Sequence, residues 1–157
     1  MNYLVTGIGD GSLHVMAAPR PRQLHNHIRY LKMQGITKVL CLMEPLEMER
    51  LDLQEEEKWC VSEGLKYENF PITDHSVTGV DRVRDLAKRL LQEIIAGEHL
   101  VVHCYAGIGR TGLVSSCILM EHGMNAEEAM ALISQKRQLK VPETKEQVEF
   151  VLAYTPS

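Results

Sequence analysis

Residues 100–122 place a buried strand, a loop with glycines and a buried helix in direct succession. The apolar run Leu100-Val101-Val102 predicts a buried strand, and residues 109–122 predict a helix that is apolar nearly all round and therefore interior. The segment that joins the two reads His103-Cys104-Tyr105-Ala106-Gly107-Ile108-Gly109-Arg110-Thr111-Gly112. Because other elements must cover both the strand and the helix, this succession favours a layered fold.

Strand and helix patterns alternate along the rest of the chain. Strands are expected on either side of residues 9–11, the second at about 12–16, and then at 36–43, 65–70 and 99–103. Helices are expected at 21–34, 53–63, 80–96, 109–122 and 125–137, and from Pro142 onward. This order predicts one α/β domain over residues 1–157, with a central, mostly parallel twisted sheet and helices on both faces. Ligands of such sheets bind beyond the carboxyl ends of the strands, where Cys104 falls.

The composition disfavours several classes of function. With 157 residues, 45% of them hydrophobic and 24% charged, the chain has the make-up of one soluble globular domain. A net charge of −4 without a basic stripe disfavours nucleic-acid binding. No apolar segment reaches bilayer length and the N-terminus lacks the features of a signal peptide, so we expect no membrane association and a cytoplasmic location. We also expect a monomer that needs no cofactor.

Four cysteines, at positions 41, 60, 104 and 117, have no paired spacing, so we expect no disulfide framework. Cys41 and Cys117 lie in apolar surroundings and are expected to be buried thiols. The seven histidines lack carboxylate or thiolate ligands at site-forming spacing, so we expect no metal site. The three glutamates at 55–57 are expected to form a solvated helix face.

The loop between Cys104 and Arg110 has the features of an anion site. Backbone N–H groups converge where a glycine loop enters a helix, and the helix dipole adds positive potential. The same field favours Cys104 as the thiolate, and Arg110 offers a planar, two-pronged donor to phosphate oxygens. A nucleophile and an anion cradle therefore share one loop, which indicates chemistry on a phosphoester.

The pattern His103-Cys104-x5-Arg110-Thr111-Gly112 resembles the signature loop of the cysteine-dependent protein tyrosine phosphatase superfamily. The chain also resembles the small, atypical dual-specificity branch over residues 10–154, in size, in the order of elements and in the Glu-Thr-x-Glu-Gln stretch at 143–147. The resemblance implies the phosphatase-type α/β fold and hydrolysis of phosphotyrosine in proteins, with phosphoserine and phosphothreonine as further substrates.

The resemblance also implies a role for each residue of the loop. Cys104 would attack phosphorus and form a cysteinyl-phosphate intermediate. The Arg110 guanidinium and the backbone amides of the loop would hold the phosphate oxygens. These amides belong to Tyr105, Ala106, Gly107, Ile108, Gly109 and Arg110. His103 would orient the loop and tune the sulfur, and Thr111 would stabilise the Cys104 thiolate when it leaves in the second step.

The leaving oxygen needs a proton donor, because a phenolate has a parent pKa of about 10. Asp74 lies in a polar loop at the separation where the family keeps its acid. His75 is the local alternative, and Asp81 is expected to cap the following helix. Gln147 and Glu143 occupy the region where relatives position the second-step water, although such residues also cap helices or face solvent. The acid loop lacks the Trp-Pro of the larger tyrosine-specific enzymes, and a shallower pocket is implied.

Other functions use a loop of the same kind. Phosphoinositide phosphatases tend to carry lysines inside it, whereas Tyr105, Ala106 and Ile108 are uncharged; an RNA 5′-phosphatase is the related alternative. A phosphate-binding module without turnover usually lacks the cysteine, the arginine or the acid, and this chain has all three. Sulfur transfer and arsenate reduction are the remaining alternatives, and arsenate reduction needs resolving cysteines that the spacing does not supply. A protein monoester is therefore the favoured substrate.

Overall fold

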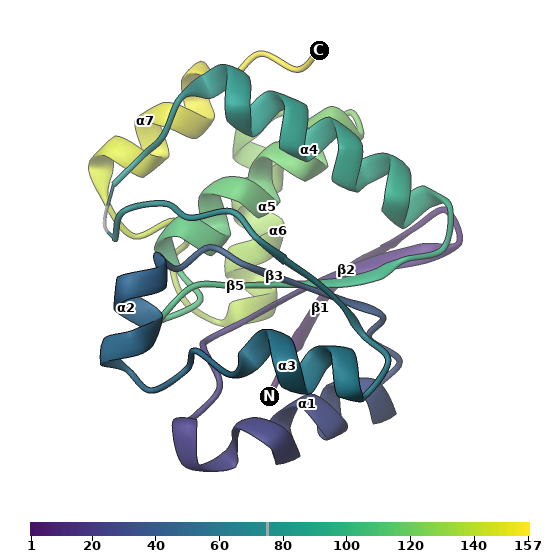
Figure 1. Ribbon diagram of the computed structural model, residues 1–157. Helices are drawn as coiled ribbons and strands as arrows, with labels where there is room; N and C mark the ends of the chain where they lie inside the picture. The colour runs from purple at the N-terminus through teal and green to yellow at the C-terminus, as the bar shows by residue number, and fades with distance from the viewer. Residues whose placement is uncertain (75) are drawn as a thin grey trace.

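The computed structural model describes residues 1–74 and 76–157, and it contains a five-stranded sheet in the order β1-β2-β5-β3-β4 (Figure 1). The strands are β1 (Tyr3–Ile8), β2 (Gly11–Met16), β3 (Lys38–Cys41), β4 (Lys66–Asn69) and β5 (His99–His103). β1 pairs antiparallel with β2, and the other pairings are parallel. The prediction of a mostly parallel sheet is confirmed, and the strand before Cys104 is its central strand.

Helices cover both faces of the sheet (Figure 1). One face carries α1 (Leu24–Met33), which follows the 3-10 turn η1 (Pro21–Gln23), and α3 (Glu56–Ser62). The opposite face carries α4 (Val80–Ile95), α5 (Gly109–Glu121), α6 (Ala126–Arg137) and α7 (Lys145–Ala153). The short α2 (Pro45–Arg50) follows the carboxyl end of β3. Within residues 1–74 and 76–157, no helix is long and apolar enough to cross a membrane.

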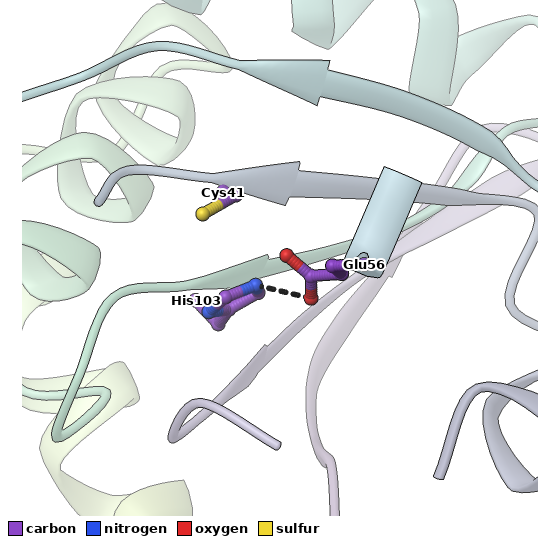
Figure 2. Close-up of side chains that lie close together, drawn as sticks. All are labelled: Cys41, Glu56 and His103. Atoms are coloured by element: carbon purple, nitrogen blue, oxygen red, sulfur yellow. Dashed lines mark hydrogen bonds and ion pairs between the residues drawn. The ribbon is translucent and has the colours of Figure 1, made fainter. Parts of the chain in front are cut away.

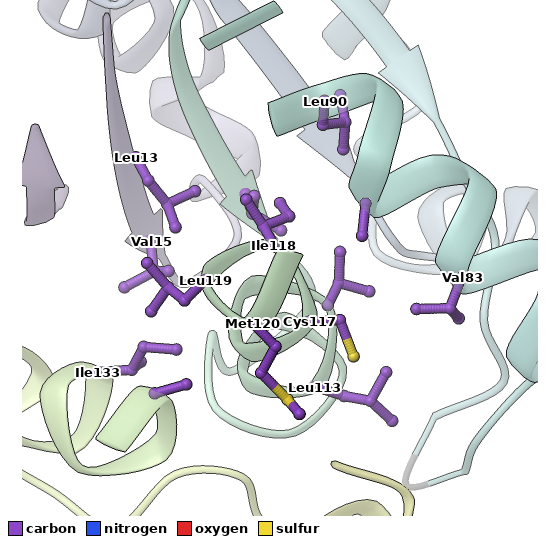
Figure 3. Close-up of a cluster of buried hydrophobic side chains, with 14 of the residues drawn as sticks. Leu13, Val15, Val83, Leu90, Leu113, Cys117, Ile118, Leu119, Met120 and Ile133 are labelled. Carbon is purple, nitrogen blue, oxygen red and sulfur yellow. The ribbon is translucent and has the colours of Figure 1, made fainter. Parts of the chain in front are cut away.

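Each face of the sheet buries its own hydrophobic core. The larger core has α5 at its centre, and every residue of this helix from Gly109 to Met120 is buried, as its apolar sequence predicts. Figure 3 shows side chains of β2, α4 and α6 gathered around α5, among them Leu13, Val15, Val83, Leu90 and Ile133. The smaller core lies under α1 and α3 and includes Ile28, Leu31 and Cys60. The loop that begins at Cys104 is therefore held between two packed layers.

Several boundaries differ from the predictions. Residues 45–50 form α2, which the sequence analysis missed because only Met48 of this short helix is buried, too little to show a period. α4 begins after Gly79 without a side-chain cap, so the prediction that Asp81 caps this helix is wrong. The last helix begins at Lys145 rather than at Pro142, because Thr144 caps it through the Gln147 N–H.

Candidate active site

Cys104 directly follows β5 and lies at the floor of a cavity of about 230 Å³. The residue is only 2% exposed, and it is one of the residues that line this cavity. The lining residues are Asp74, Cys104, Tyr105, Ala106, Gly109, Arg110 and Glu143. The fold thus brings the predicted acid Asp74 to the loop that carries both the predicted nucleophile and the predicted arginine. A hollow of about 450 Å³ lies elsewhere, beside Met1 and Tyr30, and no residue of the loop lines it.

The carbonyl groups of the loop bind to parts of the chain that do not line the cavity. The Tyr105 carbonyl accepts a hydrogen bond of 2.9 Å from the Ala18 N–H. Arg137 of α6 donates to the Ala106 carbonyl at 3.0 Å and to the Gly107 carbonyl at 3.2 Å. Because C=O and N–H of a trans peptide point in opposite directions, the N–H groups that follow these carbonyls turn toward the cavity. The loop is therefore arranged as a set of donors for an anion.

Close packing against β2 makes glycine necessary at position 107. Gly107 has a φ of 73°, in the left-handed region, and a Cβ there would collide with the Met16 carbonyl at the end of β2. The Arg137 guanidinium, which binds the loop from behind, also lies 4.7 Å from the centre of the Tyr3 ring. The sequence analysis missed Arg137, since a basic residue in a last helical turn usually serves the helix dipole alone.

Arg110 is 1% exposed and its guanidinium is held by carboxylates. Its two terminal nitrogens bind both oxygens of Glu47 on α2, at 2.8 and 2.9 Å, and one of them also donates to the Ile72 carbonyl at 2.9 Å. Burial alone would lower the pKa of Arg110, but the Glu47 hydrogen bonds and the Cys104 sulfur outweigh it and raise the pKa. Arg110 Nε is buried without a hydrogen-bond partner in the described part of the chain, so it is available to a bound oxyanion.

Asp74 lies at the rim of the cavity. Its side chain is 47% exposed, and its Oδ1 is 3.1 Å from a terminal nitrogen of Arg110. The predicted acid therefore reaches Arg110 of the loop even though its own loop lacks the Trp-Pro sequence. His75, the alternative proton donor, lies outside the described residues.

A family model described as a Swiss Army Knife protein, DSP-PTPase phosphatase domain (PTP-SAK), matches residues 6–154. The chain belongs to this family. The predicted resemblance to dual-specificity phosphatases is confirmed by this match, which covers nearly the whole chain.

Curated relatives agree with the family but differ in length. The chain is 26% identical over 140 residues to protein tyrosine phosphatase type IVA 3 of Bos taurus, which covers 88% of this chain and 75% of that protein. It is 32% identical over 75 residues to protein tyrosine phosphatase domain-containing protein 1 of Danio rerio, or 47% of this chain. That match covers 10% of the Danio rerio protein, so the chain spans only a small part of the length of this relative.

Solved structures of phosphatases share the fold. Kinase-associated phosphatase, with its catalytic cysteine replaced by serine, aligns with a TM-score of 0.82 and 16% identity over 96% of this chain and 91% of its own. The active form of Tk-PTP aligns with a TM-score of 0.71 and 26% identity over 95% and 93%. PTPMT1 in complex with PI(5)P aligns with a TM-score of 0.76 and 18% identity over 98% and 93%. The PTP-SAK domain described here thus has the α/β fold that its sequence predicts.

Beneath the loop of this PTP-SAK domain lies a buried pair of charged residues. His103 Nε2 is 2.7 Å from Glu56 Oε2, and both side chains are 0% exposed. His103 Nδ1 is 3.0 Å from the Cys104 carbonyl oxygen. Figure 2 shows Glu56 reaching from α3 toward His103 beside the end of β3. The prediction that residues 55–57 form a solvated face is therefore wrong for Glu56, because α3 packs this position against the sheet.

Cys41 completes a cluster with this pair, and its possible ligand atoms and those of Glu56 and His103 all lie within 4.8 Å of one another (Figure 2). It is the one cluster in the described ranges with three side chains close enough to hold a metal ion. The sequence analysis missed it because its members come from β3, α3 and β5. Within the cluster, His103 and Glu56 already bind each other through a hydrogen bond of 2.7 Å.

Gln147 and Thr111 are also buried, each at 0% exposure. The side-chain oxygen Oε1 of Gln147 accepts hydrogen bonds from the main-chain N–H groups of Glu143 and Thr144. Its side-chain nitrogen Nε2 donates to the Ser76 carbonyl at 3.3 Å. Gln147 therefore joins α7 to the loop that carries Asp74. Within the described residues, the Thr111 hydroxyl has no hydrogen-bond partner, so the predicted bond to Cys104 is not formed in this state.

Proposed function

We propose that this domain hydrolyses phosphotyrosine in proteins, with phosphoserine and phosphothreonine as further substrates, through a cysteinyl-phosphate intermediate. The observation that carries the proposal is the cavity itself, which has Cys104 at its floor, Arg110 beside it and Asp74 at its rim. A monoester fits there with its phosphorus over the sulfur and its ester oxygen toward the rim. Phosphorylated proteins are then the partners of the domain.

In the first step the Cys104 thiolate attacks phosphorus in line with the ester oxygen. The S–P bond forms, the P–O bond to the substrate breaks, and Asp74 gives its proton to the leaving oxygen. The loop amides and Arg110 Nε hold the three remaining phosphate oxygens as charge develops on them. These amides are the N–H groups of Tyr105, Ala106, Gly107, Ile108, Gly109 and Arg110.

In the second step a water molecule attacks the phosphorus of the cysteinyl-phosphate. The Asp74 carboxylate takes a proton from this water, the new P–O bond forms, and the S–P bond breaks to release inorganic phosphate and the Cys104 thiolate. The unpartnered Thr111 hydroxyl is then a donor for that thiolate. Glu143 lines the cavity and is close enough to hold the water, whereas the Gln147 amide is bound to main-chain groups and positions the acid loop instead.

The acidic walls of the cavity argue against a polyanionic substrate. Asp74 and Glu143 both line it, and no lysine does. A phosphoinositide such as the PI(5)P bound to PTPMT1, or an RNA 5′ end, would bring further negative charge against these carboxylates. A binding module without turnover would have no use for the juxtaposition of a thiol and a carboxyl across one cavity.

Two further expectations belong to this proposal. All four cysteines are free thiols, which suits a reducing compartment such as the cytoplasm. We also propose that the domain acts as a monomer, because each group assigned to the reaction comes from one chain.

Steady-state hydrolysis of a phosphotyrosine peptide tests the function, with phosphoserine and phosphothreonine peptides and a phosphoinositide panel as competing substrates. We expect the phosphotyrosine peptide to give the highest kcat/KM and Cys104→Ser to remove activity. A lipid or an RNA 5′ end preferred over every peptide would overturn the assignment. Binding of the phosphopeptides without any turnover would instead show that the domain is a phosphate-binding module.

Asp74→Asn tests the proton donor. We expect kcat to fall about a hundred- to a thousandfold with KM nearly unchanged, because the amide keeps the shape but has no proton to give. Asp81→Asn, an exposed position at the start of α4, is the matched control and should behave as the wild type. An Asp74→Asn variant with normal kcat would remove Asp74 from the mechanism.

A further inference from the structure

The pair formed by Glu56 and His103 fixes the protonation of the histidine. The Cys104 carbonyl oxygen can only accept a hydrogen bond, so His103 Nδ1 must carry a proton to bind it at 3.0 Å. A carboxylate likewise only accepts, so Nε2 must carry a proton to bind Glu56 at 2.7 Å. With Glu56 as the carboxylate, both bonds together require the imidazolium form of His103.

Burial makes this charge dependent on Glu56. Burial by itself lowers the pKa of His103, but the Glu56 carboxylate, aided by Cys41, outweighs it and raises the pKa well above the ordinary 6.5. His103 supplies the positive charge that compensates the buried Glu56 carboxylate, and the Tyr67 hydroxyl also interacts with that carboxylate.

The pair is joined to Cys104 through the main chain, by the hydrogen bond from His103 to the Cys104 carbonyl. His103 is the last residue of β5 and faces the α1 and α3 side, where its neighbour in β3 is Cys41. The next residue, Cys104, packs into the opposite core and lines the cavity. Since the Cys104 carbonyl is held toward His103, the N–H of Tyr105 in the same peptide points the other way, toward the cavity.

We propose that Glu56 is a positioning residue: through the His103 imidazolium it holds the first peptide of the loop with its N–H toward the bound anion, and it keeps a positive charge beneath the Cys104 thiolate. This role rests on the proposed phosphatase function. Glu56 touches neither substrate nor sulfur, and its effect passes through His103 alone.

Other ionisable groups face the pair from each surrounding element. These are His27 of α1, Cys41 of β3, Glu47 of α2, Cys60 of α3 and Tyr67 of β4. Burial and neighbouring charges lower the pKa of His27 to about 4, so it is neutral above that pH, and burial raises the pKa of Tyr67. Near pH 7, Glu56 therefore supplies the negative charge closest to His103.

The first experiment measures how fast iodoacetamide alkylates Cys104 between pH 4 and pH 9, in the full chain, with Cys104→Ser as the blank for the buried thiols. We expect Glu56→Gln to move the pH of half-maximal reaction upward by about one unit, because the neutral amide no longer sustains the imidazolium beneath the sulfur. Glu57→Gln, one residue along and exposed, should match the wild type. An identical profile for Glu56→Gln and wild type would overturn the proposal.

The same variants are assayed on the phosphotyrosine peptide. We expect Glu56→Gln to lower kcat/KM about tenfold, with its pH profile displaced by the same amount as the alkylation profile. Glu56→Asp should restore part of the rate, since it keeps the charge. A wild type without turnover would refute the phosphatase assignment, while the alkylation profiles would still decide the role of Glu56.

Because Glu56→Gln can fail to fold, a third measurement uses the wild type. Nitrogen chemical shifts of His103, assigned by comparison with His103→Asn, should show both ring nitrogens protonated at pH 7 and up to pH 8. A neutral ring at pH 7 would overturn the proposal. So would purified protein that carries one metal ion per chain and loses the His103 to Glu56 hydrogen bond on account of it.

Discussion

At the scale of single residues, the Arg110 guanidinium has to meet two opposite requirements. It must remain charged while 1% exposed, and it must offer donors to a phosphate that is absent for part of the cycle. Glu47 meets the first requirement through two parallel hydrogen bonds to the terminal nitrogens. The unpartnered Nε meets the second, because it faces no protein acceptor in the described ranges. The guanidinium is thus oriented before the substrate arrives.

Glu47→Gln tests this orientation. We expect the free energy of unfolding to fall by about 1–3 kcal/mol, because the buried guanidinium loses its opposing charge. We also expect kcat/KM to fall about tenfold, because the donors of Arg110 are less well fixed. Chemical denaturation and peptide hydrolysis measure the two effects. Glu49→Gln, exposed on the same helix, is the control, and equal behaviour of both variants would contradict the assignment.

At the scale of elements, the loop is fixed by helices that contribute no reacting group. α6 places Arg137 against the carbonyls of Ala106 and Gly107, α2 supplies Glu47, α3 supplies Glu56, and α7 ties the acid loop through Gln147. A donor set for a tetrahedral anion needs several peptides aligned together, and a loop with two glycines would not hold that alignment unaided.

Arg137→Gln is the test at this scale. We expect kcat/KM to fall about ten- to a hundredfold, since the amides of Gly107 and Ile108 lose the restraint that aims them at the cavity. Binding of vanadate, an anion with the same loop contacts, should weaken in parallel. Lys136→Gln, exposed on the same turn, serves as the control. Unchanged vanadate binding in Arg137→Gln would show that the loop keeps its shape without α6.

For the whole molecule, we expect the stability to depend on pH through two buried histidines whose pKa values are shifted in opposite directions, His14 downward and His103 upward. Burial, then the nearby His99, lowers the pKa of His14 in β2 to about 4. Unfolding exposes His14 to its ordinary pKa of 6.5, so its contribution is present above pH 6.5 and is lost as the pH falls toward 4. The raised pKa of His103 works in the other direction: its contribution is present below 6.5 and is lost as the pH rises through the folded value. Together they place the greatest stability near neutral pH.

Urea unfolding between pH 4 and pH 7 checks the acid side. We expect the unfolding free energy to fall by up to about 3 kcal/mol over this range on account of His14. His14→Gln should make this slope smaller, because glutamine has no proton to gain on unfolding, while His27, whose pKa is also lowered to about 4, keeps its own share. His122→Gln, at an exposed position, should leave the slope as it is. A slope in His14→Gln equal to that of the wild type would show that His14 contributes nothing to the acid sensitivity.

The local pattern of the sequence was sufficient for the sheet, for the interior helix α5 and for the place of Cys104 and Arg110. Strand and helix periods are short-range properties, and a thiol, glycines and an arginine on one loop are visible without any partner. Asp74 was predicted from the family resemblance, which implies an acid at this separation from the loop. The short helix α2 was not predicted, since a helix with a single buried residue shows no hydrophobic period.

Only the tertiary structure decided which charged side chains are removed from solvent and paired with groups of the site. Glu47, Glu56 and Arg137 look like surface residues in sequence, and two of the three glutamates at 55–57 are indeed exposed. The packing of α2, α3 and α6 on the sheet selects the ones that face Arg110, His103 and the loop carbonyls. Ion pairs and hydrogen bonds of this kind join residues tens of positions apart, and their energies depend on burial and distance, which a linear pattern does not contain.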